Sequence, residues 1–298
     1  IFENLPDSAF DADSFRVRVK RSQPMDFKSI EIERKLGAIL LKSGFEKKVK
    51  MKDADLEIDV EIFNNVAYFS YKKYEGAGGL SACSGGKLIA LLSSGIDSPV
   101  AAYRMMRRGA RVIFIHFSGY PYTDTDEMEQ CKEIVEILAD YQFDSKLYIV
   151  SFGEIQKAIA TNLEVPAKIR TVLYRRMMLR IAESFAKKDG ANGLITGDNF
   201  GQVASQTPEN MFAIHQASTI PVYQPLIAFD KEDIIRESEQ IGTFEISKEP
   251  CKDSCSMFMP KSPELRANVF DVLRVEESLG LDELIEKAIS DVEILYFD

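Results

Sequence analysis

The chain of 298 residues is poor in cysteine, and this excludes two classes of protein. Its four cysteines, Cys83, Cys131, Cys251 and Cys255, are too few for a disulfide scaffold of this length. No Cys-x-x-Cys pair occurs, and Cys251 and Cys255 do not make a zinc site without two further ligands. We therefore expect no bound structural metal and a cytoplasmic protein.

Long apolar runs are also missing. No stretch is long enough to span a bilayer, and no signal-peptide pattern or internal repeat occurs, so we expect no membrane contact. The lysine-bearing P-loop pattern is absent as well. What remains, 45% hydrophobic and 28% charged residues, is typical of a globular protein large enough for two domains. Ile1 in place of an initiating Met predicts a natural chain that begins further upstream.

Charge is distributed unevenly. The net charge is −10, yet residues 1–85 carry 14 basic and 14 acidic side chains, whereas residues 259–298 carry 4 and 10. The neutral N-terminal part holds clustered cations, which can bind a phosphate backbone although charge alone does not decide it. These cations are Arg16, Arg18, Lys20 and Arg21, and then Lys47, Lys48, Lys50 and Lys52.

The first 79 residues predict a small α+β module. Apolar and basic side chains alternate over 14–20, which is typical of a half-buried strand with a cationic outer face. Residues 27–43 predict a helix that ends at Gly44. Two strand-like runs within 56–73 flank Asn64-Asn65, a hairpin signal. The Gly- and Ser-rich stretch that follows predicts a linker over 80–86.

From Lys87 onward, strands and helices alternate. Strands are predicted over 88–92, 112–117, 146–151, 193–197 and 225–227, and helices over 126–139, 170–187, 231–240 and 262–287. This alternation predicts a doubly wound α/β domain over 87–298, with its ligands at the carboxyl ends of the strands.

The most informative segment joins the first of these strands to a helix. The strand stops at Ser93-Ser94-Gly95-Ile96-Asp97-Ser98, and Pro99 lies in the first turn of the helix that follows. Free N–H groups and the positive end of the helix dipole favour phosphate there. The loop therefore predicts an anion site, against the alternative of an ordinary serine-rich turn. Asp97 is a candidate for binding Mg²⁺ or for capping the helix.

Further candidates lie at the ends of the neighbouring strands, where a nucleoside normally sits. Leu91 and Leu92 end the first strand, and His116 and Phe117 end the second, although His116 also fits a packed core histidine. Gly197 ends the fourth strand, where the backbone can approach a purine.

Other polar residues fit both a functional and a structural role. Gln206 belongs to a polar run that can hydrogen-bond phosphate or sugar. Arg175 and Arg176 can reach phosphate or RNA, or lie on a solvated helix face. Lys231 can neutralise charge on phosphate, or begin a helix at the surface. A thiolate at Cys255 is a candidate sulfur carrier, against a buried inert thiol.

Taken together, these motifs resemble the tRNA 4-thiouridine synthetases, which are tRNA sulfurtransferases of the ATP pyrophosphatase (PP-loop) superfamily. The resemblance lies in Ser-Ser-Gly-Ile-Asp-Ser-Pro-Val at 93–100, Tyr-Arg-Arg-Met-Met at 174–178, Gly-Gln-Val-Ala-Ser-Gln-Thr at 201–207, Pro-Leu-Ile at 225–227 with Asp230-Lys231, and Cys-Ser-Met-Phe at 255–258. Ser94 departs from the family loop, which has Gly there.

The resemblance implies a fold. Residues 87–298 would form a doubly wound parallel-sheet ATP pyrophosphatase domain, similar to the adenine nucleotide alpha hydrolases. Residues 1–79 would form a THUMP RNA-binding domain with part of an N-terminal ferredoxin-like piece.

It also implies a reaction: ATP adenylates uridine 8 of tRNA with release of pyrophosphate, and sulfur then replaces AMP to give 4-thiouridine. The same sulfur delivery serves the thiamin thiazole in this family. The implied ATP contacts are Leu91, Leu92, Ser93, Ser94, Gly95, Ile96, Asp97, Ser98, His116, Phe117, Arg175, Gly197 and Gln206, with Mg²⁺ as cofactor. The implied catalytic residues are Cys255, Asp97, Lys231 and Cys251, and the implied RNA contacts are Arg16, Arg18, Lys20, Arg21, Lys47, Lys48 and Lys50.

The sulfur source stays open. Some members carry a sulfur-relay cysteine in a C-terminal rhodanese domain, which we do not expect here. Others bind an iron–sulfur cluster through a Cys-x-x-Cys, but the aligned stretch is Thr171-Val172-Leu173-Tyr174, so no cluster is expected. Free sulfide, a persulfide donor such as a cysteine desulfurase, or a Cys251–Cys255 relay remain. A homodimer is equally open.

Two other functions fit the same loop. One is an adenylating amidotransferase of the PP-loop class, which uses ammonia and needs neither Cys255 nor an RNA-binding module. The other is a non-catalytic tRNA-binding protein with a degenerate nucleotide site, for which Ser94 is the motivation.

Overall fold

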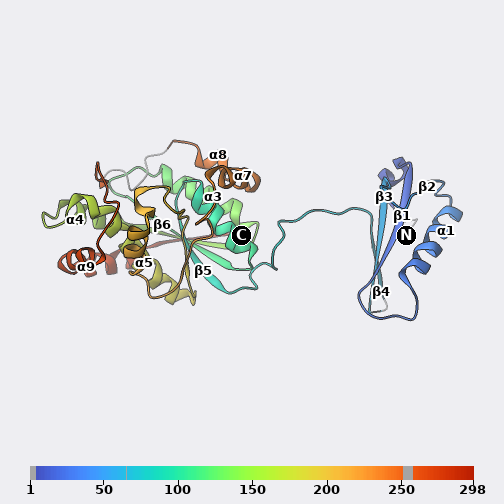
Figure 1. The fold of residues 1–298 in the computed structure, drawn as a ribbon, viewed down its shortest axis with the longest axis horizontal. Coiled ribbons are helices and arrows are strands. Elements are labelled where there is room, and N and C mark those ends of the chain that lie inside the picture. The colour runs from blue at the N-terminus through green and yellow to red at the C-terminus, as the bar shows by residue number, and fades with distance from the viewer. Residues whose placement is uncertain (1–4, 65, 251–257) are drawn as a thin grey trace. The chain divides into compact units, whose positions relative to one another are not determined.

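The computed structural model describes residues 5–64, 66–250 and 258–298. The chain forms two compact units, Ile1–Ala77 and Gly78–Asp298, each drawn in Figure 1. Residues of the expected linker belong to the second unit, because the Leu80 N–H donates to the Arg107 carbonyl (2.8 Å) and the Gly85 N–H to the Gly109 carbonyl (2.7 Å). The domain boundaries expected at 79 and 87 stay predictions. No helix in the described ranges is long and apolar enough to cross a bilayer.

The first unit is a four-stranded sheet with one long helix. Its elements are β1 (Ser14–Arg21), α1 (Ser29–Lys42), β2 (Lys48–Val49), β3 (Leu56–Phe63) and β4 (Val66–Ser70), after a short 3₁₀ turn at Asp7–Asp11. The strand order is β2-β1-β3-β4, with β1 parallel to β2 and β3, and β3 antiparallel to β4. Phe15, Leu40 and Phe45 pack in its core. The predicted strand, helix and hairpin of this unit are confirmed.

The second unit is built on a six-stranded sheet. Its strands are β5 (Lys87–Leu92), β6 (Arg111–Ser118), β7 (Ser145–Ser151), β8 (Leu194–Ile195), β9 (Val222–Tyr223) and β10 (Glu293–Phe297). The order is β10-β7-β6-β5-β8-β9, and every pair is parallel except β10 with β7. The chain winds outward from β5 in one direction to β6 and β7, and in the other to β8 and β9. This reversal is the point where doubly wound folds bind ligands.

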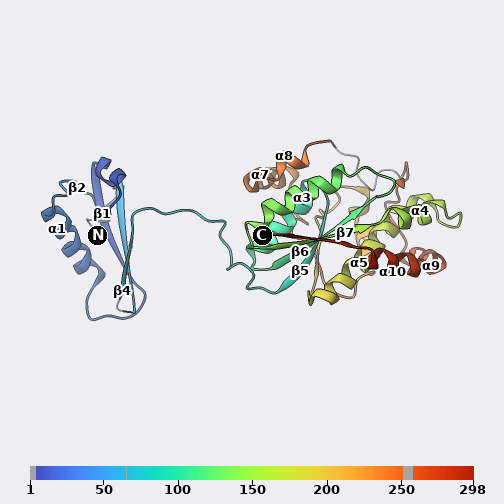
Figure 2. The ribbon, with the colours of Figure 1, turned by 180° about the vertical axis from the view of Figure 1, so that it is seen from behind.

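Helices cover both faces of this sheet, as Figures 1 and 2 show. One face packs against α2 (Asp97–Arg107), α3 (Asp126–Ala139) and α7 (Lys231–Ile241). The other packs against α4 (Gly153–Thr161), α5 (Arg170–Asp189), α6 (Pro208–His215), α9 (Val269–Ser278) and α10 (Asp282–Ser290). A short helix, α8 (Phe244–Ser247), follows α7. Both faces of β5 are buried, which explains its uninterrupted apolar sequence.

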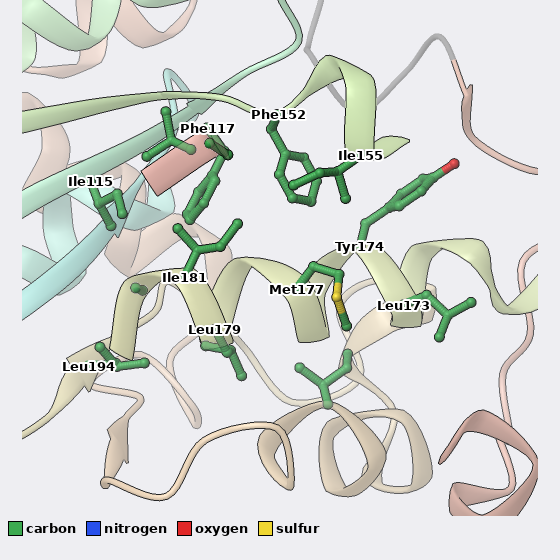
Figure 3. Close-up of a cluster of buried hydrophobic side chains, with 14 of the residues drawn as sticks. Ile115, Phe117, Phe152, Ile155, Leu173, Tyr174, Met177, Leu179, Ile181 and Leu194 are labelled. Carbon is green, nitrogen blue, oxygen red and sulfur yellow. The ribbon is translucent and has the colours of Figure 1, made fainter. Parts of the chain in front are cut away.

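The apolar core between the sheet and α5, on the second of these faces, lies directly under the ends of the strands. Figure 3 shows Phe117 and Phe152 above α5, with Ile181 of α5 pointing toward Phe117. The rings of Phe117 and Phe152 meet edge to face, with their centroids 5.4 Å apart. Apolar packing of this kind holds α5 against the sheet, so that the first turns of α5 reach the carboxyl ends of the strands.

Three predictions about this unit were wrong or incomplete. Residues 225–227 are not a strand but part of a turn, in which the Ile227 N–H donates to the Gln224 carbonyl (3.2 Å). The acidic helical region begins at Val269 rather than 262, because the Asn268 side chain caps α9 by accepting from the Phe270 N–H (2.9 Å). The antiparallel strand β10 was not predicted.

Glu183 on α5 fixes the turn that leads into β9. Its buried carboxylate accepts from the Thr219 N–H (2.7 Å), the Thr219 hydroxyl, the Ser218 hydroxyl (3.0 Å) and Lys187 (2.7 Å). Burial alone would raise the pKa of Glu183, but Lys187 and the bonds from Thr219 and Ser218 outweigh it and lower the pKa from 4.5 to about 2.

Because the folded pKa lies below the unfolded one, this group stabilises the protein fully above about pH 4.5 and loses that effect as the pH falls toward 2. We expect Glu183→Gln to lower the free energy of unfolding at pH 7 by up to about 3 kcal/mol, and by much less at pH 3. Urea denaturation at both pH values measures this. Glu133→Gln, at an exposed position, is the control; an equal loss at pH 3 and pH 7 would contradict the assignment.

Candidate functional site

A cavity of about 420 Å³ lies where β5, β6 and β8 end, at the reversal of the sheet. This size is suited to a small ligand. Most residues predicted to hold a nucleotide line it, namely Leu91, Leu92, Ser93, Asp97, Ser98, His116, Phe117, Arg175, Gly197 and Gln206. Ser94, Gly95 and Ile96 belong to the same loop but not to the lining.

The loop between β5 and α2 is closed on itself by Ser98. The Ser98 hydroxyl accepts from the Ser93 N–H (2.9 Å) and donates to the Ser93 carbonyl (3.1 Å). Ser94 does not have a positive φ, so the backbone conformation at the position where the family has glycine is one that serine adopts without strain. The loop thus keeps the N-terminus of α2 directed at the cavity.

Gly197 is the point at which the segment after β8 touches this loop. A Cβ atom at Gly197 would lie 2.8 Å from the Ser98 nitrogen and 3.0 Å from the Asp97 carbonyl carbon. The sequence predicts that Gly197 leaves room for a purine. In the structure the space beside its Cα is filled by the backbone of the loop. Glycine is needed here because the two segments that form the cavity touch backbone to backbone.

Asp97 and Lys231 meet at the mouth of the loop although 134 positions separate them. Lys231, the first residue of α7, donates to one oxygen of Asp97, and the Gln202 amide donates to the other (3.1 Å). The alternative that Asp97 caps α2 is not supported, because the described structure contains no such side-chain hydrogen bond. The side chain of Asp97 lines the cavity instead.

Asp198 is a further residue of the site that the sequence alone does not single out. Its side chain is only 3% exposed, yet it accepts hydrogen bonds from Arg175 (2.6 Å), Thr196 (2.8 Å) and Gln206 (3.3 Å). Burial alone would raise the pKa of Asp198, but the Arg175 guanidinium and the side-chain interactions with His215, Arg175 and Thr196 outweigh it and hold the pKa well below its usual range. Asp198 is therefore a buried anion that holds Arg175 and Gln206, two predicted ligand-binding residues, in place.

His116 is packed in the core, as one of its two interpretations had it, whereas the alternative that Arg176 lies on a solvated helix face is wrong. His116 is 1% exposed, with its Nδ1 atom 3.1 Å from the Leu92 carbonyl and 3.4 Å from the Cys131 sulfur, although it also lines the cavity. Arg176 is equally buried and donates to Glu276 and to the Ala213 carbonyl. It joins α5 to α6 and α9 and does not reach the cavity.

Cys251 and Cys255 lie outside the described residues. The chain resumes at Phe258, whose carbonyl accepts from the Tyr174 hydroxyl (3.3 Å), and Met259 lines the cavity beside Thr171. The part of the chain that follows the cysteines thus returns to the wall of the cavity. In the described ranges, no group of three or more His, Cys, Asp or Glu side chains is arranged to hold a metal ion.

The basic residues of the first unit fall into two groups. Three of those in β1 face acidic residues of β3: Arg16 lies 3.7 Å from Glu57, Arg18 3.2 Å from Glu57, and Lys20 3.7 Å from Glu61. Their positive charges are thereby balanced within the sheet. The fourth, Arg21, donates to the Met25 carbonyl (3.3 Å) and to the Phe27 carbonyl. Lys48 in β2 and Lys50 just after it are exposed and form no ion pair among the described residues. Of the two predicted RNA-contacting clusters, the lysine cluster therefore presents the more accessible charge.

Comparison with known proteins gives consistent matches. The family model of the thiamine biosynthesis protein ThiI matches residues 83–281, and the THUMP domain model matches residues 2–72. A probable tRNA sulfurtransferase of Thermus thermophilus is 44% identical over 285 residues, which is 95% of this chain and 70% of the relative. One from Coxiella burnetii is 40% identical over 288 residues, 95% of this chain and 72% of the relative.

Two solved structures are similar as well. A 4-thiouridine synthetase in complex with RNA and ATP superposes with a TM-score of 0.84 at 35% identity, covering 96% of this chain and 75% of that one. The protein PH1313 of Pyrococcus horikoshii gives a TM-score of 0.56 at 25% identity, covering 79% and 68%.

The contact at Gly197 yields a test of how the cavity is built. We expect Gly197→Ala to push the backbone of Asp97 and Ser98 away from β8, because neither partner has a flexible side chain that can yield. A small ligand that needs the loop should then bind at least tenfold more weakly. Gly37→Ala, in α1 of the first unit, is the control, since nothing lies within 4 Å of its added Cβ and Gly37 does not line the cavity. Equal affinities for ATP in the two variants, measured by calorimetry, would refute this role.

Proposed function

The chain belongs to the family of the thiamine biosynthesis protein ThiI, with a THUMP domain ahead of the catalytic unit, and we propose from this that it is an ATP-dependent tRNA sulfurtransferase that makes 4-thiouridine. The observation that carries the proposal is the cavity at the reversal of the sheet. It is lined by the strand-to-helix loop and by the residues expected around a nucleotide. Its substrates would be ATP and tRNA, and it would act in the cytoplasm.

In this proposal ATP lies across the cavity. The apolar side chains of Leu91 and Phe117 face the nucleoside, and the N–H groups at the start of α2 face the phosphates. Lys231 supplies positive charge next to Asp97. The Asp97 carboxylate on the cavity wall is suited to Mg²⁺, which proteins often bind through one or two carboxylates together with substrate phosphates. When bound at Asp97, Mg²⁺ would neutralise charge on the departing pyrophosphate.

The reaction would proceed in two steps. The O4 atom of uridine 8 attacks the α-phosphorus, the bond to the β-phosphate oxygen breaks, and pyrophosphate leaves. The base then carries AMP on O4, which is a far better leaving group than the original oxygen. The terminal sulfur of a persulfide on Cys255 attacks C4, and AMP departs.

The sulfur must then be released from the enzyme. The Cys251 thiolate attacks the Cys255 sulfur, breaks the sulfur–sulfur bond and leaves the thiolated base with a Cys251–Cys255 disulfide. An external dithiol reduces this disulfide before the next cycle. A persulfide donor such as a cysteine desulfurase would pass its outer sulfur to the Cys255 thiolate and leave as a thiol. In the alternative, free sulfide attacks C4 directly and displaces AMP, and neither a persulfide nor a disulfide forms.

Replacement of Asp97 tests the first step. We expect Asp97→Ala to abolish formation of AMP and pyrophosphate with tRNA binding unchanged, because the change removes the carboxylate from the cavity wall and leaves Lys231 without its partner. Pyrophosphate release in the presence of tRNA, Mg²⁺ and ATP is the measurement. Asp233→Ala, on the exposed part of α7, is the control. Release at the parental rate from the Asp97 variant would refute this role.

Replacement of Cys255 separates the two steps. We expect Cys255→Ala to stop sulfur transfer, detected by mass analysis of tRNA digests, while AMP still forms in a tRNA-dependent way. Cys83→Ala, which lies in the second unit away from the proposed chemistry, should retain both steps. AMP formation that does not depend on tRNA would favour the amidotransferase alternative, and no AMP formation from the parental protein would favour the non-catalytic one.

Replacement of the two basic clusters of the first unit is expected to affect tRNA binding to different extents. Lys48→Ala/Lys50→Ala should weaken tRNA binding and lower the slope of log Kd against log salt by about one for each phosphate that the variant no longer binds. The matched double variant Arg18→Ala/Lys20→Ala should change the slope less, because Glu57 and Glu61 already balance those charges. Filter binding at several salt concentrations measures both slopes. A larger effect from the second variant would contradict the ranking.

A further inference from the structure

We propose that Asp198 is a positioning residue: it turns the amide of Gln206 so that the Gln206 carbonyl accepts a hydrogen bond from an N–H or O–H donor on the nucleoside. The inference rests on the proposed function, because it takes ATP as the ligand of the cavity. The oriented Gln206 carbonyl would let the site distinguish adenosine from nucleosides that lack the matching donor.

The orientation of Gln206 follows from the chemistry of its neighbour. An ionised carboxylate can only accept hydrogen bonds, and an amide donates only from its nitrogen. The Gln206 Nε2 atom lies 3.3 Å from Asp198 Oδ1, so its NH₂ end must face Asp198 and its oxygen must face away. Exchange of the two amide ends would place two acceptors against each other.

The surroundings keep Asp198 charged and stationary. Arg175 donates to Oδ1 at 2.6 Å and Thr196 donates to Oδ2 at 2.8 Å. A second amide, from Gln224, donates to Oδ2 at 3.4 Å, and its orientation follows from the same chemistry. Thr196 and Gln206 come from the loop after β8 and Arg175 from α5, so Asp198 ties two walls of the cavity together.

The oxygen of Gln206 is the unused end of this arrangement. Gln206 lines the cavity and is 8% exposed, and its Oε1 atom is buried without a hydrogen-bond partner among the described residues. A buried carbonyl without a hydrogen-bond donor is unfavourable, so a ligand that donates a hydrogen bond to Oε1 binds more tightly than one that does not. The cavity is thereby prepared for a donor at this point and not for an acceptor.

ATP offers two kinds of donor. The 6-amino group of adenine is one, and the 2′- and 3′-hydroxyls of ribose are the other. The phosphates and the ring nitrogens of adenine are acceptors and would be repelled by Oε1. Inosine triphosphate, which has a keto oxygen in place of the amino group, removes the first donor, and 2′-deoxy-ATP and 3′-deoxy-ATP each remove one of the second kind.

The test compares the affinities of the full chain for these four nucleotides, measured by calorimetry with Mg²⁺. We expect the parental protein to bind at least one analogue about tenfold more weakly than ATP, which is the effect of one lost hydrogen bond. Loss with inosine triphosphate identifies the base amine as the donor, and loss with a deoxy analogue identifies a ribose hydroxyl.

The decisive variant is Asp198→Asn, which keeps the size of the side chain but adds a donor. The Gln206 amide is then free to turn, and the preference for ATP over the penalised analogue should fall to threefold or less. Asp189→Asn is the control, since the Asp189 carboxylate likewise accepts side-chain hydrogen bonds, from Lys146 and Tyr148, but does not line the cavity. It should keep the full preference.

Other outcomes overturn the inference. Binding of all four nucleotides within threefold by the parental protein would do so, as would an unchanged preference in Asp198→Asn. If thermal melting shows that Asp198→Asn does not fold, Gln206→Leu replaces it; this variant has no amide oxygen and must lose the same preference. Failure of the parental protein to bind ATP at all would instead count against the proposed function.

Discussion

The close contact between Gly197 and the backbone at Asp97 and Ser98 is the constraint on which the site depends. It brings together the ends of β5 and β8, the two strands between which the sheet reverses its winding. The loop between β5 and α2 comes from one side of the reversal, and the polar segment with Gln202 and Gln206 comes from the other. Because both segments meet without intervening side chains, the cavity between them has a defined shape before any ligand arrives.

Electrostatics then divides the cavity into two parts. Near the loop, Asp97 is paired with Lys231 at a position that is partly open to solvent, where ligand phosphates and a cation can rearrange the pair. Deeper in, Asp198 and Arg175 form a pair that the ligand does not need to break, because its role is to orient neighbouring groups. In the proposed reaction, an exchangeable pair at the phosphates and a permanent pair near the nucleoside would suit a site that releases pyrophosphate before the rest of the nucleotide.

Much of this arrangement could be predicted from the sequence, because its signals are local. The apolar strand, the serine-rich turn and Pro99 lie within a dozen consecutive positions and predict the loop on their own. Asp198 could not be found in this way, since its importance comes from Arg175, Gln206 and Gln224, which converge only in the folded chain. The predicted strand at 225–227 failed for a similar reason: an apolar Pro-Leu-Ile suits a strand or a buried turn equally, and Leu226 is buried through a turn. The roles of Cys251 and Cys255 stay predictions.

The antiparallel strand β10 has a consequence for synthesis of the protein. It covers the outer edge of β7, yet about 140 residues lie between the end of β7 and the start of β10. While the ribosome adds those residues, the edge of β7 exposes unpaired N–H and C=O groups that can pair with another nascent chain. A cell that makes this protein must protect that edge for several seconds of translation, so demand for chaperones should be greatest just before residues 293–297 emerge.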